Sequence, residues 1–414
     1  MKVLRWVLFV SAVFACSAVP CRAQQPPAAE PDTRTQFPPL LRDGFFGISL
    51  GAMDSPFSAS QLSPGFRAAD IRTPGPAFQI TLLGKQFNQY FSGEMTYTRP
   101  VQWVRYDSIN GSTDNQSVWV VLGEFKLRGR IPLNDKVWLY GEAGVAVTSR
   151  HGAETPSGTP IVESAHYPAF LTGGGVQYQA NDRWSFLAGF TRSAGSRTHN
   201  QPRTLLFTGG VRYYMRPLPA DQVAAAARGE YPVRANSIHV DYGASMAGFG
   251  LNTFFSSTLP IFWKGNLAVD HGFRVRYERN LFHTARLFAL DLGVSGARWH
   301  GQKTEEHLAS VSIYPLLRFF IARTPSADVQ FTYSLAGPTI LFQDTLPNQP
   351  ISLNGQPIGT NWFSFQDLMG VSVLAGKDRR VSLGLGIGHY SNGNLFPINA
   401  GVAIPLTLSV GYAF

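Results

Sequence analysis

The stretch VSLGLGIGHYSNGNLFPINAGVAIPLTLSVGYAF, residues 381–414, decides the fold of this chain. From Val381 to Gly388, branched apolar residues alternate with serine or glycine, and the alternation returns from Leu406 to Phe414. A period of two is typical of a strand with one apolar face and one face of small or polar residues. Strands of an outer-membrane barrel have this pattern, because one face meets lipid and the other meets the barrel interior.

The same alternation recurs along the chain in two sets of eight segments. The first set comprises residues 44–52, 76–85, 90–99, 117–129, 136–147, 168–179, 183–193 and 204–215. The second comprises residues 237–245, 272–280, 287–297, 306–320, 328–337, 363–374, 379–389 and 404–414. Within each set, long connections alternate with short ones. This indicates barrels with long extracellular loops and short periplasmic turns.

A proline-containing segment, residues 216–235, interrupts the strands, and its DQVAAAAR sequence predicts a short helix in a periplasmic linker. We therefore predict an all-β protein with two eight-stranded antiparallel barrels in tandem, residues 44–215 and 236–414. The alternative is a single sixteen-stranded barrel, which would leave a water-filled channel where eight strands would not. In the second barrel we expect Arg276 to face Asp291 across the ladder, as a charge pair inside the lumen.

The N-terminus has the features of a secretory signal. Lys2 and Arg5 precede a short apolar run, and Ala23 offers a cleavage site. We expect residues 1–23 to be removed and residues 24–43 to form a disordered periplasmic leader. Removal would take away both cysteines, leaving no disulfide or thiol chemistry. The expected location is the outer membrane of a Gram-negative bacterium.

Composition excludes several function classes. No stretch after the signal approaches the length of an apolar membrane helix, and only 15% of residues are charged, with a net charge of +9. The glycines do not form a phosphate-binding loop, and the nine histidines have no metal-ligand spacing. We expect no cofactor, no metal and no nucleic-acid partner.

The motif HYSNGNLFPINAG is followed by a final strand with aromatic residues. This combination resembles the lipid A deacylases of the PagL type, which are outer-membrane esterases also called acyloxyacyl hydrolases. The resemblance covers about residues 237–414. It implies that His389 and Ser391 are catalytic and that Asn392 contributes to the oxyanion site. The family's third catalytic residue, a glutamate, falls on Ala403.

The implied substrate is lipid A of lipopolysaccharide, which would lose an ester-linked acyl chain without a cofactor. The N-terminal half resembles small OmpA-like barrels in general. The terminal strand ending at Phe414 implies recognition by the barrel-assembly machinery.

The residues themselves are compatible with ester hydrolysis. His389 and Ser391 are two apart in an extended segment, so both side chains leave the same face, which is the apolar, lipid-facing one. We expect both near the extracellular rim, with a ring nitrogen within hydrogen-bond reach of the hydroxyl. The alternative reading is that His389 and Tyr390 are interfacial anchors of the kind common at barrel rims.

Another residue must hold the imidazole if the site is active, because alanine cannot. A turn centred on Lys377 would place Phe365 opposite His389 and Asp367 diagonal to it, on the outward face. A shift by one residue would instead point Asp367 into the lumen. Asn394 and Asn399 are loop alternatives. The competing functional hypothesis is a non-enzymatic barrel protein that retains a degenerate deacylase motif.

Overall fold

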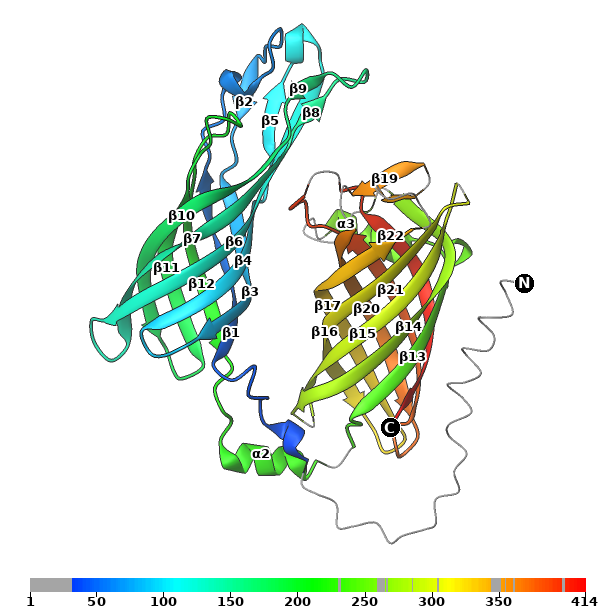
Figure 1. The fold of residues 1–414 in the computed structure, drawn as a ribbon. Coiled ribbons are helices and arrows are strands. Elements are labelled where there is room, and N and C mark those ends of the chain that lie inside the picture. The colour runs from blue at the N-terminus through cyan, green and yellow to red at the C-terminus, as the bar shows by residue number, and fades with distance from the viewer. Residues whose placement is uncertain are drawn as a thin grey trace. The chain divides into compact units, whose positions relative to one another are not determined.

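The computed structural model describes residues 32–229, 232–258, 265, 267–284, 286–303, 305–343, 351–353, 355–359, 362–396 and 399–414 (Figure 1). The expected signal, residues 1–23, lies outside the described residues, as do residues 24–31 of the expected leader. The rest of the leader includes a short 3-10 helix, η2, at Thr33–Thr35.

The N-terminal barrel closes on itself. Its eight wall strands, in order around the barrel, are β1 (Gly44–Asp54), β3 (Pro76–Gln86), β4 (Phe91–Pro100), β6 (Asn115–Pro132), β7 (Val137–His151), β10 (Ala165–Gln179), β11 (Trp184–Ser193) and β12 (Thr204–Tyr214). The last strand pairs antiparallel with the first, from Phe45 opposite Tyr214 to Asp54 opposite Leu205. No strand edge is therefore left open in this wall.

Part of what the sequence predicts as loops in the N-terminal half is ordered structure. The short strands β2 (Asp70–Arg72) and β5 (Val104–Asp107) extend the sheet beside β6, while β8 (Ala153–Glu154) pairs with β9 (Pro160–Val162). A buried apolar cluster that includes Tyr106, Val118 and Ile161 holds them together. The apolar residues of these connections thus build a core of their own, which explains the difference from the expectation.

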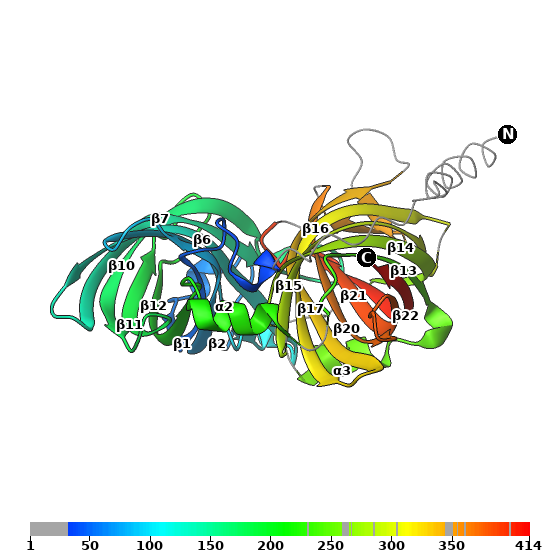
Figure 2. The ribbon, with the colours of Figure 1, turned by 90° about the horizontal axis from the view of Figure 1, so that it is seen from below.

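Helix α2 (Ala220–Ala227) occupies the expected linker, and the second barrel follows. Its wall strands are β13 (Asn236–Ala244), β14 (Leu267–His283), β15 (Phe288–Gly301), β16 (His307–Arg323), β17 (Ala327–Phe342), β20 (Phe363–Ala375), β21 (Val381–Ser391) and β22 (Val402–Ala413). Ser237 pairs with Ala413, so β22 closes onto β13 (Figure 2). Two separate closures establish two eight-stranded barrels and exclude the single sixteen-stranded one.

Three further elements lie in the connections of the C-terminal barrel. Helix α3 (Gly250–Thr258) follows β13, and the hairpin β18 (Ile351–Leu353) with β19 (Gln356–Gly359) follows β17. Among the described residues, no helix is long and apolar enough to cross a membrane.

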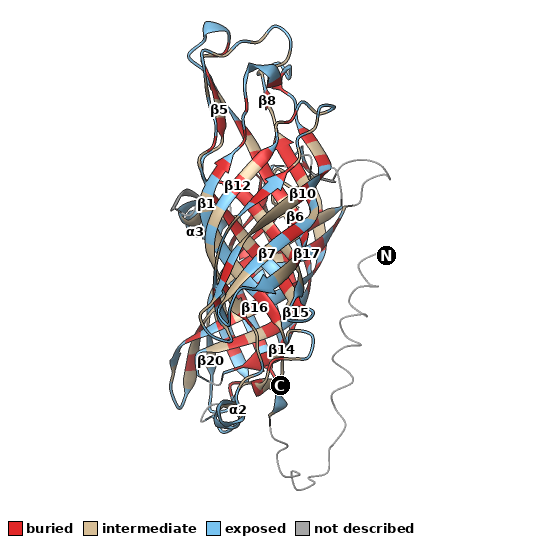
Figure 3. Cartoon of the chain, turned by 90° about the vertical axis from the view of Figure 1, so that its left-hand side faces the viewer, coloured by how far each residue is buried: buried red, intermediate tan, exposed pale blue. Residues whose placement is uncertain are grey.

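Buried and exposed residues alternate along the wall strands (Figure 3). On β21, Val381, Leu383 and Leu385 are about half exposed, whereas Ser382 between them is buried. Apolar residues outside and polar residues inside are the reverse of a soluble barrel, and this arrangement fits a wall surrounded by lipid.

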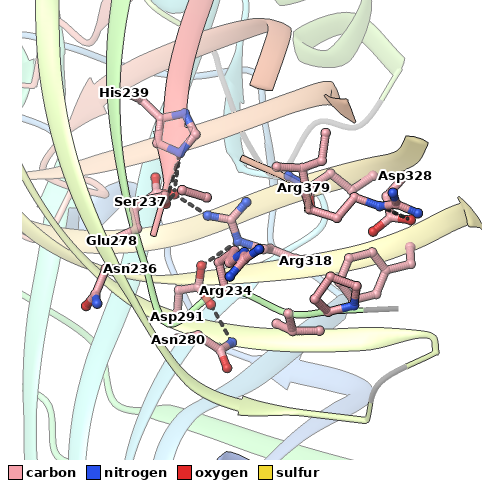
Figure 4. Close-up of a pocket in the computed structure, with 16 residues that line it drawn as sticks. Arg234, Asn236, Ser237, His239, Glu278, Asn280, Asp291, Arg318, Asp328 and Arg379 are labelled. Carbon is pink, nitrogen blue, oxygen red and sulfur yellow. Dashed lines mark hydrogen bonds and ion pairs between the residues drawn. The ribbon is translucent and has the colours of Figure 1, made fainter. Parts of the chain in front are cut away.

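Paired charges line a pocket in the lower lumen of the C-terminal barrel (Figure 4). Asp241 accepts hydrogen bonds from Nε of Arg274 and of Arg276, both at 2.8 Å. Arg318 pairs with Glu278 and with Asp291. The expected pair of Arg276 with Asp291 is wrong, because Arg276 lies opposite Ser295, four residues from the expected register. The lumen nevertheless contains paired charges, as expected, although the partners differ.

The other end of this lumen is apolar. Its buried cluster includes Trp299, Leu308, Tyr390, Val402 and Ile404. The C-terminal barrel is therefore filled with side chains at both levels, as expected for eight strands.

Candidate functional site

The pairing of β20 with β21 places Asp367 directly opposite His389. The carboxylate Oδ2 lies 3.5 Å from the imidazole Nδ1. This distance is longer than an ordinary N–H···O hydrogen bond, but it keeps the two groups in electrostatic contact. The expected register was wrong by two residues, since Phe365 lies opposite Ser391 and not opposite His389.

His389 and Asp367 belong to the outward-facing positions of their strands. His389 continues the spacing of the exposed Leu383 and Leu385 on β21, and Asp367 continues that of Val371 and Val373 on β20. Both polar side chains are nonetheless buried, with 4% and 8% of their surface exposed. A polar pair removed from water on a lipid-facing wall is costly unless its members stabilise each other.

An irregularity in β17 fixes the carboxylate. The β17–β20 register shifts between Ser334 and Gly337, and Ala336 has a positive φ of 53°. The shift turns the Ala336 amide toward Asp367, whose Oδ1 accepts its hydrogen bond at 2.6 Å. One oxygen of Asp367 is thus held by the backbone of β17 while the other faces His389.

Ser391, the last residue of β21, is held by Asn399. The Asn399 Nδ2 donates to the Ser391 Oγ at 2.9 Å, and the Gly393 amide donates to the same oxygen at 3.1 Å. The hydroxyl is not hydrogen-bonded to His389, which differs from the expectation. Side chains two residues apart on a strand are separated by about 6–7 Å, so a shared face alone does not bring them into contact.

The asparagines and glycine after Ser391 form a tight turn. Leu395 N–H donates to the Asn392 carbonyl at 3.1 Å, and Gly393 and Asn394 have φ values of 65° and 59°. Positive φ at both central positions is the signature of a type I′ turn, which favours glycine and asparagine. Asn394 Oδ1 also accepts from Asn399 Nδ2 at 2.8 Å, so the turn helps to hold Asn399 beside Ser391. Part of the motif therefore has a purely conformational explanation.

Asn392 is buried next to Ser391. Its backbone amide donates to Asn399 Oδ1 at 3.1 Å. Asn399 was only an alternative in the sequence, but it contacts Ser391, Asn392 and Asn394 together. No sequence signal distinguishes it from Asn394, because the contacts depend on how the loop folds back.

Ala403 flanks His389 on the other side, directly opposite it on β22. It is 8% exposed, and the first residues of β14 cover it, since Ala268 pairs with Ala403 in parallel. A Cβ placed on Gly265 would lie 3.2 Å from the Ala403 Cβ. The position where the resembled family has its acid is therefore closely packed in this protein.

Tyr390 does not act as an interfacial anchor. It is fully buried in the lumen, where its hydroxyl is 2.9 Å from Ser310 Oγ and 3.2 Å from Gln366 Oε1. Gln366 is also the cross-strand partner of Tyr390, immediately beside the Asp367 and His389 pair. This inward hydrogen bond locks the register on which the outward pair depends.

Aromatic side chains surround the Ser391 end of the site. Phe365 lies opposite Ser391, and its ring packs edge-on against Phe363 at 5.1 Å between centroids. Phe363 also contacts Phe396 of the following loop at 6.1 Å. Sequence reasoning placed Phe365 beside the site but gave the aromatic residues no role, although Phe363 and Phe365 alternate on an expected strand. Within the described part of the chain, no group of three or more histidine, cysteine or acidic side chains is arranged to hold a metal ion.

The closed barrels with apolar outer faces define an outer-membrane β-barrel protein of a Gram-negative bacterium. Residues 77–191 match the family described as the OmpA-like transmembrane domain. No curated protein is significantly similar to this chain in sequence.

Three of the solved structures that match are small outer-membrane barrels, and each covers less than half of this chain. The outer-membrane enzyme PagL is 15% identical, with a TM-score of 0.30, over 43% of this chain and 99% of its own. The N-terminal β-barrel domain of Pseudomonas aeruginosa OprF is 12% identical, with a TM-score of 0.26, over 42% and 98%. Ail of Yersinia pestis, solved with a heparin analogue, is 14% identical, with a TM-score of 0.27, over 42% and 99%. Such identities leave the roles of individual residues open.

Proposed function

We propose that the C-terminal barrel is an outer-membrane serine esterase that removes an ester-linked acyl chain from lipid A. The observation that carries this proposal is the buried pair of Asp367 and His389 on the lipid-facing wall, two residues from Ser391. An acid, an imidazole and a hydroxyl in this order are the components of a serine hydrolase triad.

In this mechanism the Ser391 hydroxyl attacks the ester carbonyl while His389 takes its proton. Asp367 stabilises the imidazolium through Nδ1, the nitrogen that faces its carboxylate. The side-chain amide of Asn392 donates to the oxyanion. His389 then protonates the departing alcohol oxygen, and water hydrolyses the acyl ester on Ser391 to release the fatty acid. The reaction requires Ser391 to exchange its partner Asn399 for His389 when substrate binds.

The aromatic side chains beside Ser391 suit an acyl substrate. Phe363, Phe365 and Phe396 offer an apolar surface to a chain whose ester lies at the hydroxyl. The substrate would approach laterally from the outer leaflet, since the site is on the outside of the barrel wall. No cofactor takes part in any step.

The test is mass spectrometry of lipid A from cells that produce the full-length protein. The expected result is loss of one ester-linked acyl chain with the wild type and an unmodified spectrum with Ser391→Ala. Ser382→Ala is the matched control, because Ser382 lies on the same strand but faces the lumen. An unmodified spectrum with folded wild-type protein in the outer membrane would overturn the proposal.

The second candidate is a non-enzymatic barrel that retains the motif. Two observations favour this second candidate. The Ser391 hydroxyl is hydrogen-bonded to Asn399, and Ala403 stands in place of the acid. The same measurement separates the candidates, because this one predicts identical spectra for the wild type and Ser391→Ala.

A further inference from the structure

Three histidines that are far apart in the sequence lie in one row on the C-terminal barrel. His300 of β15 pairs directly with His307 of β16, and the pairing of Gly272 with Trp299 puts His271 of β14 on the other side of His300. The ring centroids are 4.3 Å apart for His271 and His300, which stack, and 4.2 Å apart for His300 and His307, which meet edge to face. We call these three residues the histidine row.

The histidine row faces outward. His271 continues the spacing of the exposed Phe273 and Val275, and His300 follows the exposed Arg298 on the outward positions of β15. Four strand positions around the barrel separate β15 from β21, whereas β14, which carries His271, pairs with β22 beside the candidate esterase site through Ala268 and Ala403. The histidine row shares no residue with that site. It belongs to no function discussed above.

The row lies at the extracellular boundary of the apolar wall. The barrel termini pair at the other end, at Ser237 and Ala413, beside the short periplasmic turns. From the exposed Arg279 at that end, β14 rises about 26 Å along its axis to His271, or about 20 Å along the membrane normal at a tilt of about 40°. The intervening outward residues are apolar, including Tyr277, Val294 and Ile313. The row and Arg298 are thus placed where the phosphate groups of outer-leaflet lipids lie.

Charged and polar groups flank the histidine row. Asp270 Oδ2 lies 2.8 Å from His271 Nδ1, and Ser245 fixes the other oxygen at 2.7 Å. In the adjoining β15–β16 connection, Lys303 and Glu305 are exposed. The Glu306 carboxylate is bound by Ser352 Oγ at 2.5 Å and by the Gly355 amide at 2.8 Å. The carboxylate of Asp270 therefore lies beside His271, and Arg298 lies two residues from His300 on the same strand.

We propose that the histidine row and Arg298 bind the phosphate of an outer-leaflet lipid, and that binding strengthens as the row takes up a proton. Arg298 supplies a permanent charge and planar donors for phosphate oxygens. Each imidazolium carries two N–H groups, of which the Nδ1–H of His271 is directed to Asp270. Positive charges on neighbouring rings repel one another, and a phosphate beside them relieves that repulsion.

The sign of the pH dependence follows from linkage. A bound anion favours the charged imidazole, so the pKa of the row is higher with lipid than without it. The extra affinity is fully present below the pKa of the lipid-free row and is lost as the pH rises through the pKa of the lipid-bound row. The gain in affinity is therefore expected as the pH falls, and it is expected to be absent at about pH 8, where imidazoles are neutral.

Native mass spectrometry of the full-length protein in uncharged detergent tests this proposal. The probe is phosphatidylglycerol, whose single negative charge does not change over this pH range, in a buffer with a metal chelator. We expect about five- to tenfold tighter binding at pH 5.5 than at pH 8, corresponding to a shift of about one pKa unit. Phosphatidylcholine should show no such gain, because its headgroup carries no net charge.

Variants assign the effect to the site. The triple change His271→Gln, His300→Gln and His307→Gln should abolish the pH dependence, and Arg298→Gln should weaken binding at both pH values. Arg279→Gln is the matched control, an exposed arginine at the periplasmic end of the neighbouring strand. If the triple variant does not fold, the pKa values of the wild-type histidines, measured by NMR with and without lipid, serve instead.

Three outcomes would overturn the proposal. The first is binding that does not depend on pH or is unchanged by Arg298→Gln. The second is complete competition by inorganic phosphate at millimolar concentration, which would indicate a site for soluble anions and not for a lipid. The third is a requirement for metal, seen as binding only when the chelator is left out.

Discussion

Asp367 and His389 lie opposite each other on β20 and β21, with the carboxylate 3.5 Å from the imidazole, while Ala403 lies opposite His389 on β22. The resembled deacylases have their acid at the position of Ala403. In this chain an acid lies on the other neighbouring strand. An antiparallel sheet gives a central residue two lateral neighbours, so either strand can supply the group beside the imidazole.

Substitution of Asp367 tests its role directly. Asp367→Ala should lower deacylation by about 10²–10⁴, because orientation and charge stabilisation are lost together. The initial rate of fatty-acid release from purified lipid A by the protein in detergent would be the readout. Asp378→Ala, in the exposed turn of the same hairpin, is the control and should leave the rate unchanged. Full activity of Asp367→Ala alongside inactive His389→Ala and Ser391→Ala would mean that Asn399 or Asn394 holds the imidazole.

Restoring the family's acid should not improve the protein. Ala403→Glu places a longer, charged side chain against Gly265 and Ala268, where the chain is closely packed. We expect a lower midpoint of urea unfolding in micelles and no increase in deacylation. Ala375→Glu, at the exposed end of β20, is the control for adding a carboxylate and should leave the midpoint nearly unchanged. A large gain in activity with Ala403→Glu would show that the wild type lacks its acid.

The lumen charges predict a strong stability effect. Arg318→Met removes the common partner of Glu278 and Asp291, which are both buried. Loss of one member of such a network should lower the free energy of unfolding by about 3–5 kcal/mol. Arg279→Met, at an exposed position, should change it by less than about 0.5 kcal/mol. A similar small effect for Arg318→Met, in the same unfolding measurement, would mean that water replaces the guanidinium.

Each barrel closes by pairing its own first and last strands, so we predict that the C-terminal barrel folds without the N-terminal one. Residues 232–414 alone should refold in detergent micelles, since β22 pairs with β13 within this segment and leaves no wall edge unpaired. The check is the gel mobility of unheated samples, which distinguishes a folded barrel from an unfolded chain. Failure to refold, under conditions in which the full chain does, would show that the N-terminal half is needed for folding.

The sequence by itself determined which segments form strands and which side chains face the lipid or the lumen. The alternation from Val381 to Gly388 required a strand with an apolar outer face, and the break at residues 216–235 separated two sets of eight. The sequence also predicted that the Asp367 side chain faces outward, although it did not predict the pairing register of β20 with β21. An error of two residues leaves every side chain on its predicted face, whereas an error of one would invert them all.

Only the tertiary structure decided the register and the contacts across strands. Arg379, with a positive φ of 54°, turns its side chain into the lumen, where it pairs with Asp328 at 3.0 Å, and this lengthens the turn beyond the expected one. The histidine row has no sequence spacing that predicts it, since it depends on the pairing of three strands. The covering of Ala403 and the capture of Ser391 by Asn399 depend on how connections fold back onto the wall. Alternation is encoded locally by side-chain chemistry, whereas register and loop packing are set by contacts between segments distant in the chain.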